Sequence, residues 1–430
     1  MKTSTKIYLL LLIAALGGLL YFFFAKSISG GETEAGRLAE LPAAKAEITT
    51  EEAEAEEIPL PGLTVKQGRL LMDGRPYRGM GINYVQCFWE LLKDPANRDF
   101  VEGFRIIRED YDIPFIRFAA SPFHSYDWRL YAEDPEEYFR RMDLIVREAE
   151  KRGLGLIPSL FWWNAAVGDW CEEPLGEMGN PQSKTRAFYR TYATEFVNRY
   201  KDSPAIWGWE IGNEYLLGAD LPKLNHLPRP KAGSKEPRTA ADKLTRPMIL
   251  DLYRDLYQTI RALDAGRIIV TGDSLPREAA WFNRHKDDWG LDSREQWLEM
   301  LAADTPAEFS VVSIHLYPEL DRKYFRDEKV SLEELLRAAV QSAHGSGRAV
   351  WCGEFGPGEG HLADRPRMQS IFNALMENGV DLSALWNFCP PGKTFQPDID
   401  VTPTNEGSWL LPEIAAFNRA VAAEEPSRRP

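Results

Sequence analysis

Two glutamates, Glu214 and Glu354, each follow a short apolar run, in the segments WGWEIGNE and WCGEFG. Two carboxylates that face each other can share the work of breaking a glycosidic bond. One donates a proton to the departing oxygen, and the other attacks the anomeric carbon. Separation along the chain is no obstacle, provided that both side chains end strands of the same sheet.

Further polar and aromatic residues stand at the ends of similar apolar runs, and they supply candidates for substrate binding. Indole rings at such positions can stack on the flat C–H faces of sugars. Asp273 is left open between a substrate contact and a loop cap. The candidates for substrate binding are Asn83, Arg117, Trp163, Asn213, His315, Tyr317 and Trp386.

Other reaction types lack their usual patterns among these residues. We find no His-x-x-x-His, no Gly-x-Ser-x-Gly and no Cys–His pairing, which disfavours metallohydrolase and acyl-enzyme chemistry. We therefore expect neither a cofactor nor a bound metal.

Short apolar segments separated by amphipathic stretches must position these residues. Runs rich in Val, Ile and Trp without alternation are typical of parallel strands covered by helices. Eight such units in about 370 residues predict an α/β fold, a (β/α)8 TIM barrel, with its chemistry at the C-terminal ends of the strands. A doubly wound sheet is the alternative, but no glycine fingerprint opens the first βα turn. The predicted strands are 79–84, 113–119, 154–160, 205–214, 267–273, 309–317, 348–356 and 382–388.

The ends of the chain predict three regions. Residues 1–25 contain an uninterrupted apolar run, 7–25, preceded by Lys2 and Lys6, which predicts a membrane anchor or a cleaved signal peptide. Residues 26–60 predict a disordered acidic linker. Residues 61–430 form the expected barrel domain, opened by a β-hairpin whose turn is Asp73-Gly74. The barrel should therefore act outside the cytoplasm.

The composition of the chain excludes some classes of binding partner. The 430 residues carry a net charge of −14, so nucleic acid is an unsuitable partner. The 4 cysteines are too scattered for a disulfide scaffold or a zinc site. We expect a monomer that meets the membrane only through its N-terminal segment.

The segments WGWEIGNE and WCGEFG, with SIHLYP and ALWNF in the same strand order, resemble glycoside hydrolase family 5 of clan A. GMGINY after the hairpin and IRF on the second strand are also similar, so the resemblance covers about residues 63–420. It implies an endo-β-1,4-mannanase or cellulase type of enzyme that acts on a β-linked polysaccharide. The sugar, the linkage and the choice between endo and exo cleavage stay open.

The resemblance also implies roles for individual residues. Glu354 resembles the nucleophile and Glu214 the acid/base of a retaining enzyme, with carboxyl groups about 5–5.5 Å apart. Asn213 would bind the 2-hydroxyl of the sugar, and Trp386 would form the floor of the −1 subsite. Arg117 would keep Glu354 ionised, and Glu354 would keep Glu214 protonated. His315 and Tyr317 would orient the two glutamates and the substrate.

The third strand departs from the family pattern. Many members place a histidine at its end, where this chain has Phe161-Trp162-Trp163, and His124 is a candidate substitute. Glu210 is expected to form a buried structural pair. Cys352 should fill the barrel on the same side as Glu354, and a disulfide to Cys389 is an alternative.

Two further features were interpreted from position alone. Trp207 and Trp209, which precede Glu214 in its strand, are expected in the core. The insertion 216–243 follows the acid/base and should shape the substrate cleft. Two other functions remain, a silent carbohydrate-binding barrel and a transglycosylase that uses the same glycosyl-enzyme.

Overall fold

The computed structural model describes residues 61–223, 237–317 and 325–424. The predicted N-terminal anchor or signal peptide (1–25), the acidic linker (26–60) and residues 224–236 of the insertion lie outside this part. Among the described residues, the model contains no helix with the length and apolar character that a membrane crossing requires.

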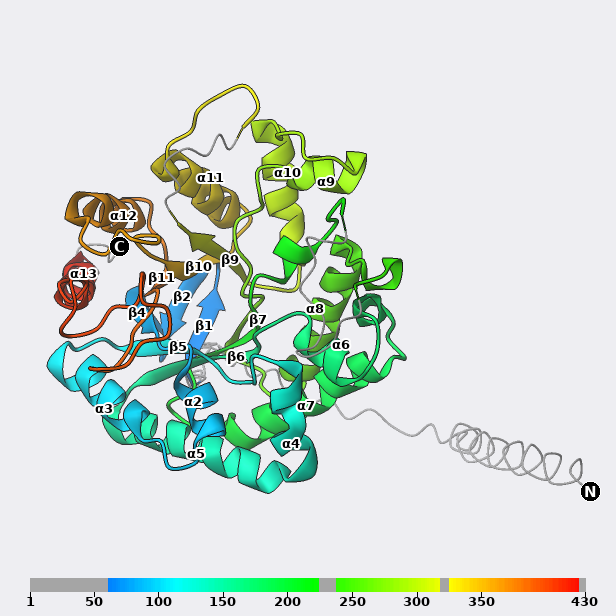
Figure 1. Ribbon diagram of the computed structural model, residues 1–430. Coiled ribbons are helices and arrows are strands. Elements are labelled where there is room, and N and C mark those ends of the chain that lie inside the picture. Colours follow the sequence, from blue (N-terminus) through cyan, green and yellow to red (C-terminus); the bar gives the residue numbers. More distant parts are fainter. Residues whose placement is uncertain (1–60, 224–236, 318–324, 425–430) are drawn as a thin grey trace, which may run out of the picture. The chain divides into compact units, whose positions relative to one another are not determined.

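Parallel strands form a ring at the centre of the domain (Figure 1). Their order is β8-β7-β6-β5-β4-β11-β10-β9, and β8 also lies against β9, so the ring closes. This confirms the (β/α)8 barrel and the eight predicted strands, since a doubly wound sheet would stay open. The strands are β4 (Gly79–Asn83), β5 (Phe115–Ala119), β6 (Gly155–Phe161), β7 (Gly208–Gly212), β8 (Ile268–Val270), β9 (Val311–Leu316), β10 (Ala349–Phe355) and β11 (Leu382–Leu385).

Helices cover the outside of the ring. Five of them coincide with the amphipathic stretches between the predicted strands: α5 (Pro135–Arg152), α7 (Lys184–Tyr200), α8 (Arg246–Arg261), α11 (Leu332–Gly345) and α12 (Arg365–Glu377). The α5 helix begins where Asp134 accepts a hydrogen bond from the Glu137 amide, and it ends at Gly153, whose φ of 60° suits glycine. The other helices are α2 (Cys87–Lys93), α3 (Asp99–Arg105), α4 (Arg129–Glu133), α6 (Ala166–Trp170), α9 (Ala280–Lys286), α10 (Arg294–Asp304) and α13 (Leu410–Glu424).

Short helical turns complete the outer layer. One is a π-helical segment, η1 (Ile106–Asp110), which directly continues α3. The 3-10 turns are η2 (Ser125–Trp128), η3 (Leu175–Gly179), η4 (Tyr215–Gly218) and η6 (Ala240–Asp242).

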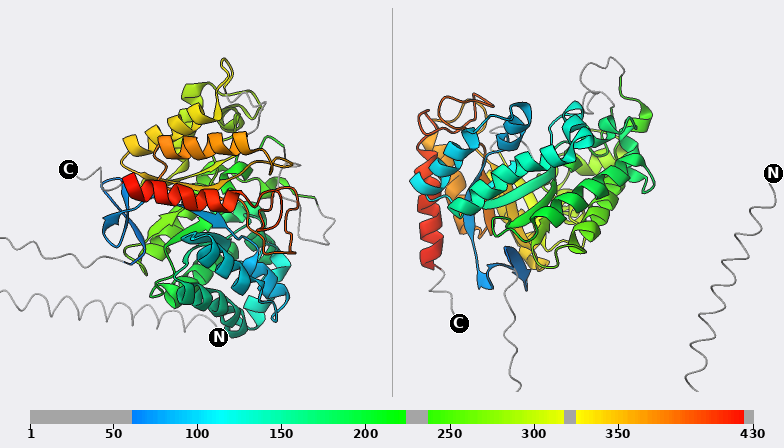
Figure 2. Two further views of the ribbon diagram at one scale, coloured as in Figure 1. Left: turned by 90° about the vertical axis from the view of Figure 1, so that its left-hand side faces the viewer. Right: turned by 90° about the horizontal axis from the view of Figure 1, so that it is seen from below.

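A small antiparallel sheet closes the end of the barrel opposite the predicted site (Figure 2). It consists of β1 (Leu63–Lys66), β2 (Arg69–Met72) and β3 (Arg75–Pro76). The predicted turn at Asp73-Gly74 joins β2 to β3, and a second turn at Gln67-Gly68 adds a strand that we did not predict. All four turn residues have positive φ, which matches the right-handed twist of a hairpin.

The small sheet β1–β3, which we call the floor sheet, packs against the end of the barrel. The Leu63 amide donates to the Trp207 carbonyl at 2.8 Å, and Trp207 contacts the rings of Tyr77 and Phe115. Trp209 is fully buried in the layer between strands and helices. Trp209 therefore belongs to the core, as predicted, whereas Trp207 is partly buried and packs against the core.

Candidate active site

Glu214 lies two residues beyond β7, and its backbone is held in an uncommon conformation. Its φ is 54° and its ψ is 32°, in the left-handed region that residues other than glycine rarely adopt. Its amide donates to the carbonyl of Gly272 at 3.0 Å. Gly272 has a φ of +79°, and a Cβ there would stand 1.9 Å from the Gly212 oxygen. The close approach of these two loops therefore requires glycine at position 272.

Glu354 reaches the barrel interior because β10 contains a bulge. Cys352 pairs with Ile314 and Glu354 with His315, so β10 has one residue more than β9 between these pairs. Trp351 points inward, where its indole donates to Glu210 at 2.9 Å. Simple alternation would then turn Glu354 outward, and the extra residue turns it inward instead.

The same bulge corrects our prediction for Cys352. That side chain packs in the layer between strands and helices rather than with the barrel-filling residues around Trp351. All four cysteines are described and free, so Cys352 and Cys389 are not joined. The error arose because the prediction assumed an unbroken strand.

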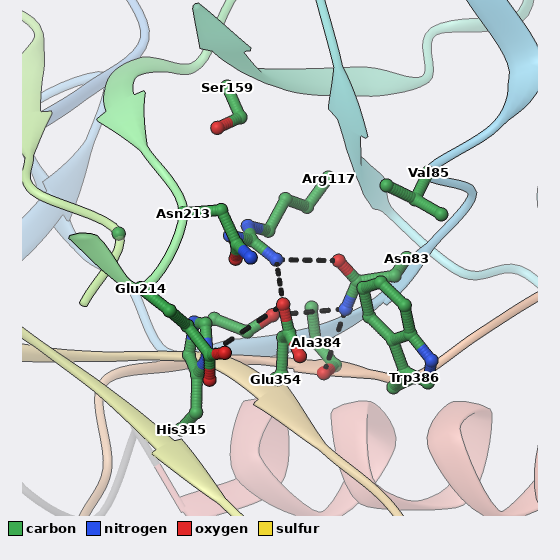
Figure 3. Close-up of polar contacts among 12 residues, drawn as sticks. Asn83, Val85, Arg117, Ser159, Asn213, Glu214, His315, Glu354, Ala384 and Trp386 are labelled. Atoms are coloured by element: carbon green, nitrogen blue, oxygen red, sulfur yellow. Dashed lines mark hydrogen bonds and ion pairs between the residues drawn. The ribbon is translucent and has the colours of Figure 1, made fainter. Parts of the chain in front are cut away.

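The two glutamates meet beside His315 (Figure 3). One oxygen of Glu214, one ring nitrogen of His315 and one oxygen of Glu354 all lie within 4.8 Å of one another. Among the described residues, this is the only group of three such side chains close enough to hold a metal ion. Its histidine Nδ1 is already 2.8 Å from Glu214 Oε1. We therefore interpret the group as an acid–base cluster.

Arg117 lies at the centre of the site and is fully buried. Its guanidinium forms ion pairs with Glu210 at 2.7 Å and with Glu354 at 2.8 Å, and it donates to Asn213 at 2.8 Å. Burial by itself lowers the pKa of Arg117, but the charges of Glu210 and Glu354 raise it above the ordinary value. The structural pair expected for Glu210 is thus with the arginine that also holds Glu354.

The carboxylate of Glu354 is held at both oxygens. Oε1 accepts from Arg117, and Oε2 accepts from the Tyr317 hydroxyl at 2.7 Å. Burial and the negative charge of Glu354 raise the pKa of Tyr317 well above its ordinary value, so the phenol remains a donor.

The pKa values of Glu214 and His315 are shifted in opposite directions. Burial by itself raises the pKa of Glu214, but the hydrogen bond and the charge of His315 lower it below the ordinary value. Burial by itself lowers the pKa of His315, but Glu354 and Glu214 raise it. These directions favour the ionised form of Glu214 and the protonated form of His315. The lowered pKa of Glu214 runs against the expectation that Glu354 keeps it protonated, because that expectation did not include the effect of His315.

Asn83 is completely buried beneath the glutamates. Its amide nitrogen donates to the Gly353 carbonyl at 3.0 Å and to the Ala384 carbonyl at 3.2 Å, and its oxygen accepts from Arg117. It thus connects the ends of three neighbouring strands to the arginine.

The predicted tryptophans lie in different surroundings. Trp386 is 7% exposed, donates to Gln396 at 2.7 Å and stacks on Trp162. Trp163 is 48% exposed and contacts the ring of His124. Trp162 occupies the position beside the glutamates, with the Arg117 guanidinium 4.7 Å from its ring.

Asp273 acts as a loop cap in this structure. Its Oδ1 accepts from the Leu216 amide at 2.9 Å, and it fixes the turn that follows Glu214. Burial raises the pKa of Asp273 to about 7.

One wall of the site was not predicted. A cavity of about 590 Å³ extends from Glu214 and Glu354 to Leu217, Arg277 and Trp289. The loop 274–279 after β8 supplies much of its lining. Trp289 is 40% exposed among charged neighbours, and an isolated tryptophan in such a segment was the signal that we missed.

The described parts of the insertion lie at two places. Leu217 lines the cavity, and Arg238 forms an ion pair with Asp169 at 2.7 Å. Asp242 accepts from the Leu175 amide at 3.1 Å, which fastens the end of the insertion to the loop after β6. The expected shaping of the cleft by 216–243 thus stays a prediction for its middle part.

Proteins of known sequence provide an independent comparison. Similar relatives include a putative mannan endo-1,4-beta-mannosidase 9 of Oryza sativa, 27% identical over 174 residues, which are 36% of this chain and 42% of that protein. A probable mannan endo-1,4-beta-mannosidase C of Aspergillus terreus is 32% identical over 108 residues, 25% of this chain and 22% of that protein. This chain therefore spans less than half the length of these curated relatives.

Solved structures share the fold. The endo-1,4-beta-mannanase of Rhizomucor miehei has a TM-score of 0.60 at 15% identity, covering 84% of this chain and 99% of that one. The endo-beta-1,4-mannanase of Thermotoga petrophila has a TM-score of 0.56 at 16% identity, covering 81% of this chain and 78% of that one. The family model described as cellulase (glycosyl hydrolase family 5) matches residues 108–392, more than half of the chain. Together with the barrel, this match shows that the chain belongs to glycosyl hydrolase family 5.

Proposed function

We propose that this protein is a retaining glycoside hydrolase that acts on a β-linked mannan or glucan. Glu354 is the nucleophile, and Glu214 is the acid/base. The observation that carries the proposal is the 4.8 Å limit on the separation of their oxygen atoms. Retaining enzymes hold the two carboxyl groups about 5–5.5 Å apart, whereas inverting enzymes need roughly 6.5–9.5 Å to admit a water.

The first step forms a covalent intermediate. An oxygen of Glu354 attacks the anomeric carbon while the glycosidic C–O bond breaks. The departing oxygen takes a proton from Glu214, which receives it from the Nδ1 of His315 at 2.8 Å. Arg117 and Tyr317 hold the Glu354 carboxylate in line throughout.

The second step releases the sugar. Glu214, now ionised, removes a proton from a water molecule, and the water oxygen bonds to the anomeric carbon. The bond to Glu354 breaks, and the carboxylate returns to its two donors. Asn213 is half-buried beside Arg117, and we assign it to the 2-hydroxyl of the sugar. Asn83 is buried, so we assign it to positioning Arg117 rather than to substrate contact.

Mannan is the favoured substrate. The curated relatives bear the name mannan endo-1,4-beta-mannosidase, and both structural relatives described above are mannanases. Cellulose-type glucans are the second candidate. Reducing-end release from mannan, glucomannan and carboxymethylcellulose, compared side by side, distinguishes them.

Glu354→Gln tests the nucleophile. The amide cannot attack, so we expect turnover of an aryl β-glycoside to fall on the order of 10⁴-fold or more. The thermal unfolding transition provides the folding control. Wild-type rates in the variant would contradict the assignment.

The same measurements address the two alternative functions. A silent carbohydrate-binding barrel would leave every aryl glycoside intact. A transglycosylase would give products longer than the substrate at high substrate concentration, visible by chromatography. The close pair of glutamates favours catalysis over silent binding.

We also propose that the barrel acts outside the cytoplasm. The support is the apolar run 7–25 and the lysines before it. Cell fractionation with an antibody to the barrel tests this location.

A further inference from the structure

The two glutamates divide the mouth of the barrel into unequal arcs. From β7 to β10, the short arc contains β8 and β9, and the long arc contains β6, β5, β4 and β11. The loops of the two arcs differ in whether their side chains leave a cavity or fill the space at the mouth of the barrel.

Among the described residues, the short arc contains a cavity. The cavity of about 590 Å³ lies here, and it runs from the glutamates past Leu217 and the loop 274–279 to Trp289. This volume falls within the roughly 300–1,000 Å³ typical of ligand sites. An extended part of a substrate can therefore lie on this side.

The long arc is filled by side chains that we call the aromatic plug: Trp89, Phe123, Trp162, Trp386 and Phe395. They form one apolar cluster with contributions from the loops of all four strands in this arc. Phe123, Trp162 and Trp386 are only 6%, 5% and 7% exposed.

Ring contacts run through the whole plug. Trp386 stacks on Trp162 with centroids 5.9 Å apart, and Trp162 meets Phe123 at 5.9 Å. Phe123 in turn stacks on Phe395 at 5.8 Å and contacts Trp89 at 5.2 Å. Little of these indole faces is left for a second sugar to stack on.

Hydrogen bonds fasten the plug to the loops beneath it. Asp400 accepts from the amides of Phe395 at 2.6 Å and Gln396 at 2.7 Å, and Gln396 accepts from the Trp386 indole. The Trp89 indole donates to Asp127 at 3.2 Å. Moving the plug aside would break these bonds and expose packed aromatic surface, which is costly.

The direction of the substrate follows from the roles of the glutamates. In the proposed mechanism Glu214 protonates the departing oxygen, and the cavity that Glu214 lines gives the leaving group its place in the short arc. With Trp386 as the expected floor of the −1 subsite, the sugar attacked by Glu354 would lie between the glutamates and this indole. Any sugar attached to its non-reducing side would have to enter the long arc, where the plug lies.

On the basis of the function proposed above, we infer that the site is closed behind a single sugar and removes residues one at a time from the non-reducing end of its substrate. The leaving group is the shortened chain, which occupies the cavity beside Trp289. The plug thus selects exo cleavage over cleavage within the chain.

Product analysis tests this inference. The full chain is incubated with β-1,4-linked mannohexaose and cellohexaose, each carrying a fluorescent tag at the reducing end. We expect tagged products that shorten by one sugar at a time, with free monosaccharide from the earliest times. Untagged disaccharide or trisaccharide among the first products would overturn the inference.

Opening the plug provides a second readout. Phe123→Ala combined with Phe395→Ala should create space behind the first sugar and raise untagged disaccharide severalfold among early products. Tyr257→Ala, which removes a half-buried ring on α8 far from the plug residues in sequence, is the matched control and should leave the product pattern unchanged. General destabilisation would lower the rate without changing the products.

The outcomes separate the two proposals. Suppose that the wild type releases untagged disaccharide or trisaccharide early and that Glu354→Gln releases none. The proposed function would then stand, and the exo inference would be wrong. No hydrolysis of either hexaose, or hydrolysis that persists with Glu354→Gln, would overturn both. If the substrate chain instead passes over the exposed Trp163, outside the plug, untagged oligosaccharides would be among the first products, which would also overturn the exo inference.

Discussion

His315 and Glu214 form the hydrogen-bonded pair on which the proposed mechanism depends most directly. The histidine is fully buried between both glutamates, 2.8 Å from Glu214 and 3.7 Å from Glu354. Its pKa is raised and that of Glu214 is lowered, so the pair holds one proton in common. In the proposed mechanism, the proton that leaves this pair at high pH is the one that the departing oxygen would receive.

His315→Gln therefore tests the pair through pH. In the wild type, the alkaline limb of kcat/KM reflects proton loss from the pair, at the raised pKa of His315. Without the imidazole, the proton resides on Glu214 alone, so we expect the limb to move to lower pH. The measurement is a pH profile with an aryl glycoside, and Glu354→Gln is the inactive reference. An unmoved limb would assign the ionisation to another group.

At the scale of elements, the bulge in β10 and the turn after β8 place the two carboxylates. The bulge turns Glu354 inward, and Gly272 permits the contact that anchors Glu214. Both devices interrupt regular strand geometry, as is common next to active sites.

Gly272→Ala should displace Glu214. The Cβ of an alanine at position 272 would collide with the Gly212 oxygen, and the φ of +79° at this position is strained for alanine. We therefore expect destabilisation of about 1–3 kcal/mol or more, together with a loss of kcat. Gly345→Ala is the matched control, because nothing lies within 4 Å of the position of its Cβ. Thermal melts and aryl-glycoside kinetics measure both effects. Equal behaviour of the two variants would disprove the steric argument.

At the scale of the whole domain, the floor sheet and the candidate site lie at opposite ends of the barrel. The floor sheet β1–β3 packs on Trp207 and Phe115, whereas the glutamates follow the C-terminal ends of the strands. A change at the floor should therefore affect unfolding more than chemistry.

Trp207→Ala separates these properties. Removing the indole leaves a void between Tyr77 and Phe115, so we expect a loss of about 3 kcal/mol in the free energy of unfolding. The kcat measured below the melting transition should stay near the wild-type value. Denaturant unfolding and steady-state kinetics check the two parts. A large fall in kcat without a change in stability would contradict this division.

The sequence by itself determined the barrel and supplied the candidate residues of its site. Eight apolar runs without alternation gave the number of parallel strands, and polar residues at their ends gave Arg117, Glu214, His315, Tyr317 and Glu354. Both signals are local, because burial on two faces selects the residue types of a strand and strand ends lie at the mouth.

Only the tertiary structure decided how these residues interact. The β10 bulge turns Glu354 to the face opposite Cys352, and the contact of buried His315 with both carboxylates raises the pKa of the imidazole while it lowers that of Glu214. The filling of the long arc and the cavity beside Trp289 depend on loops from strands far apart in sequence. Contacts of this kind arise from packing in space, and hydrophobic periodicity along the chain carries no record of them.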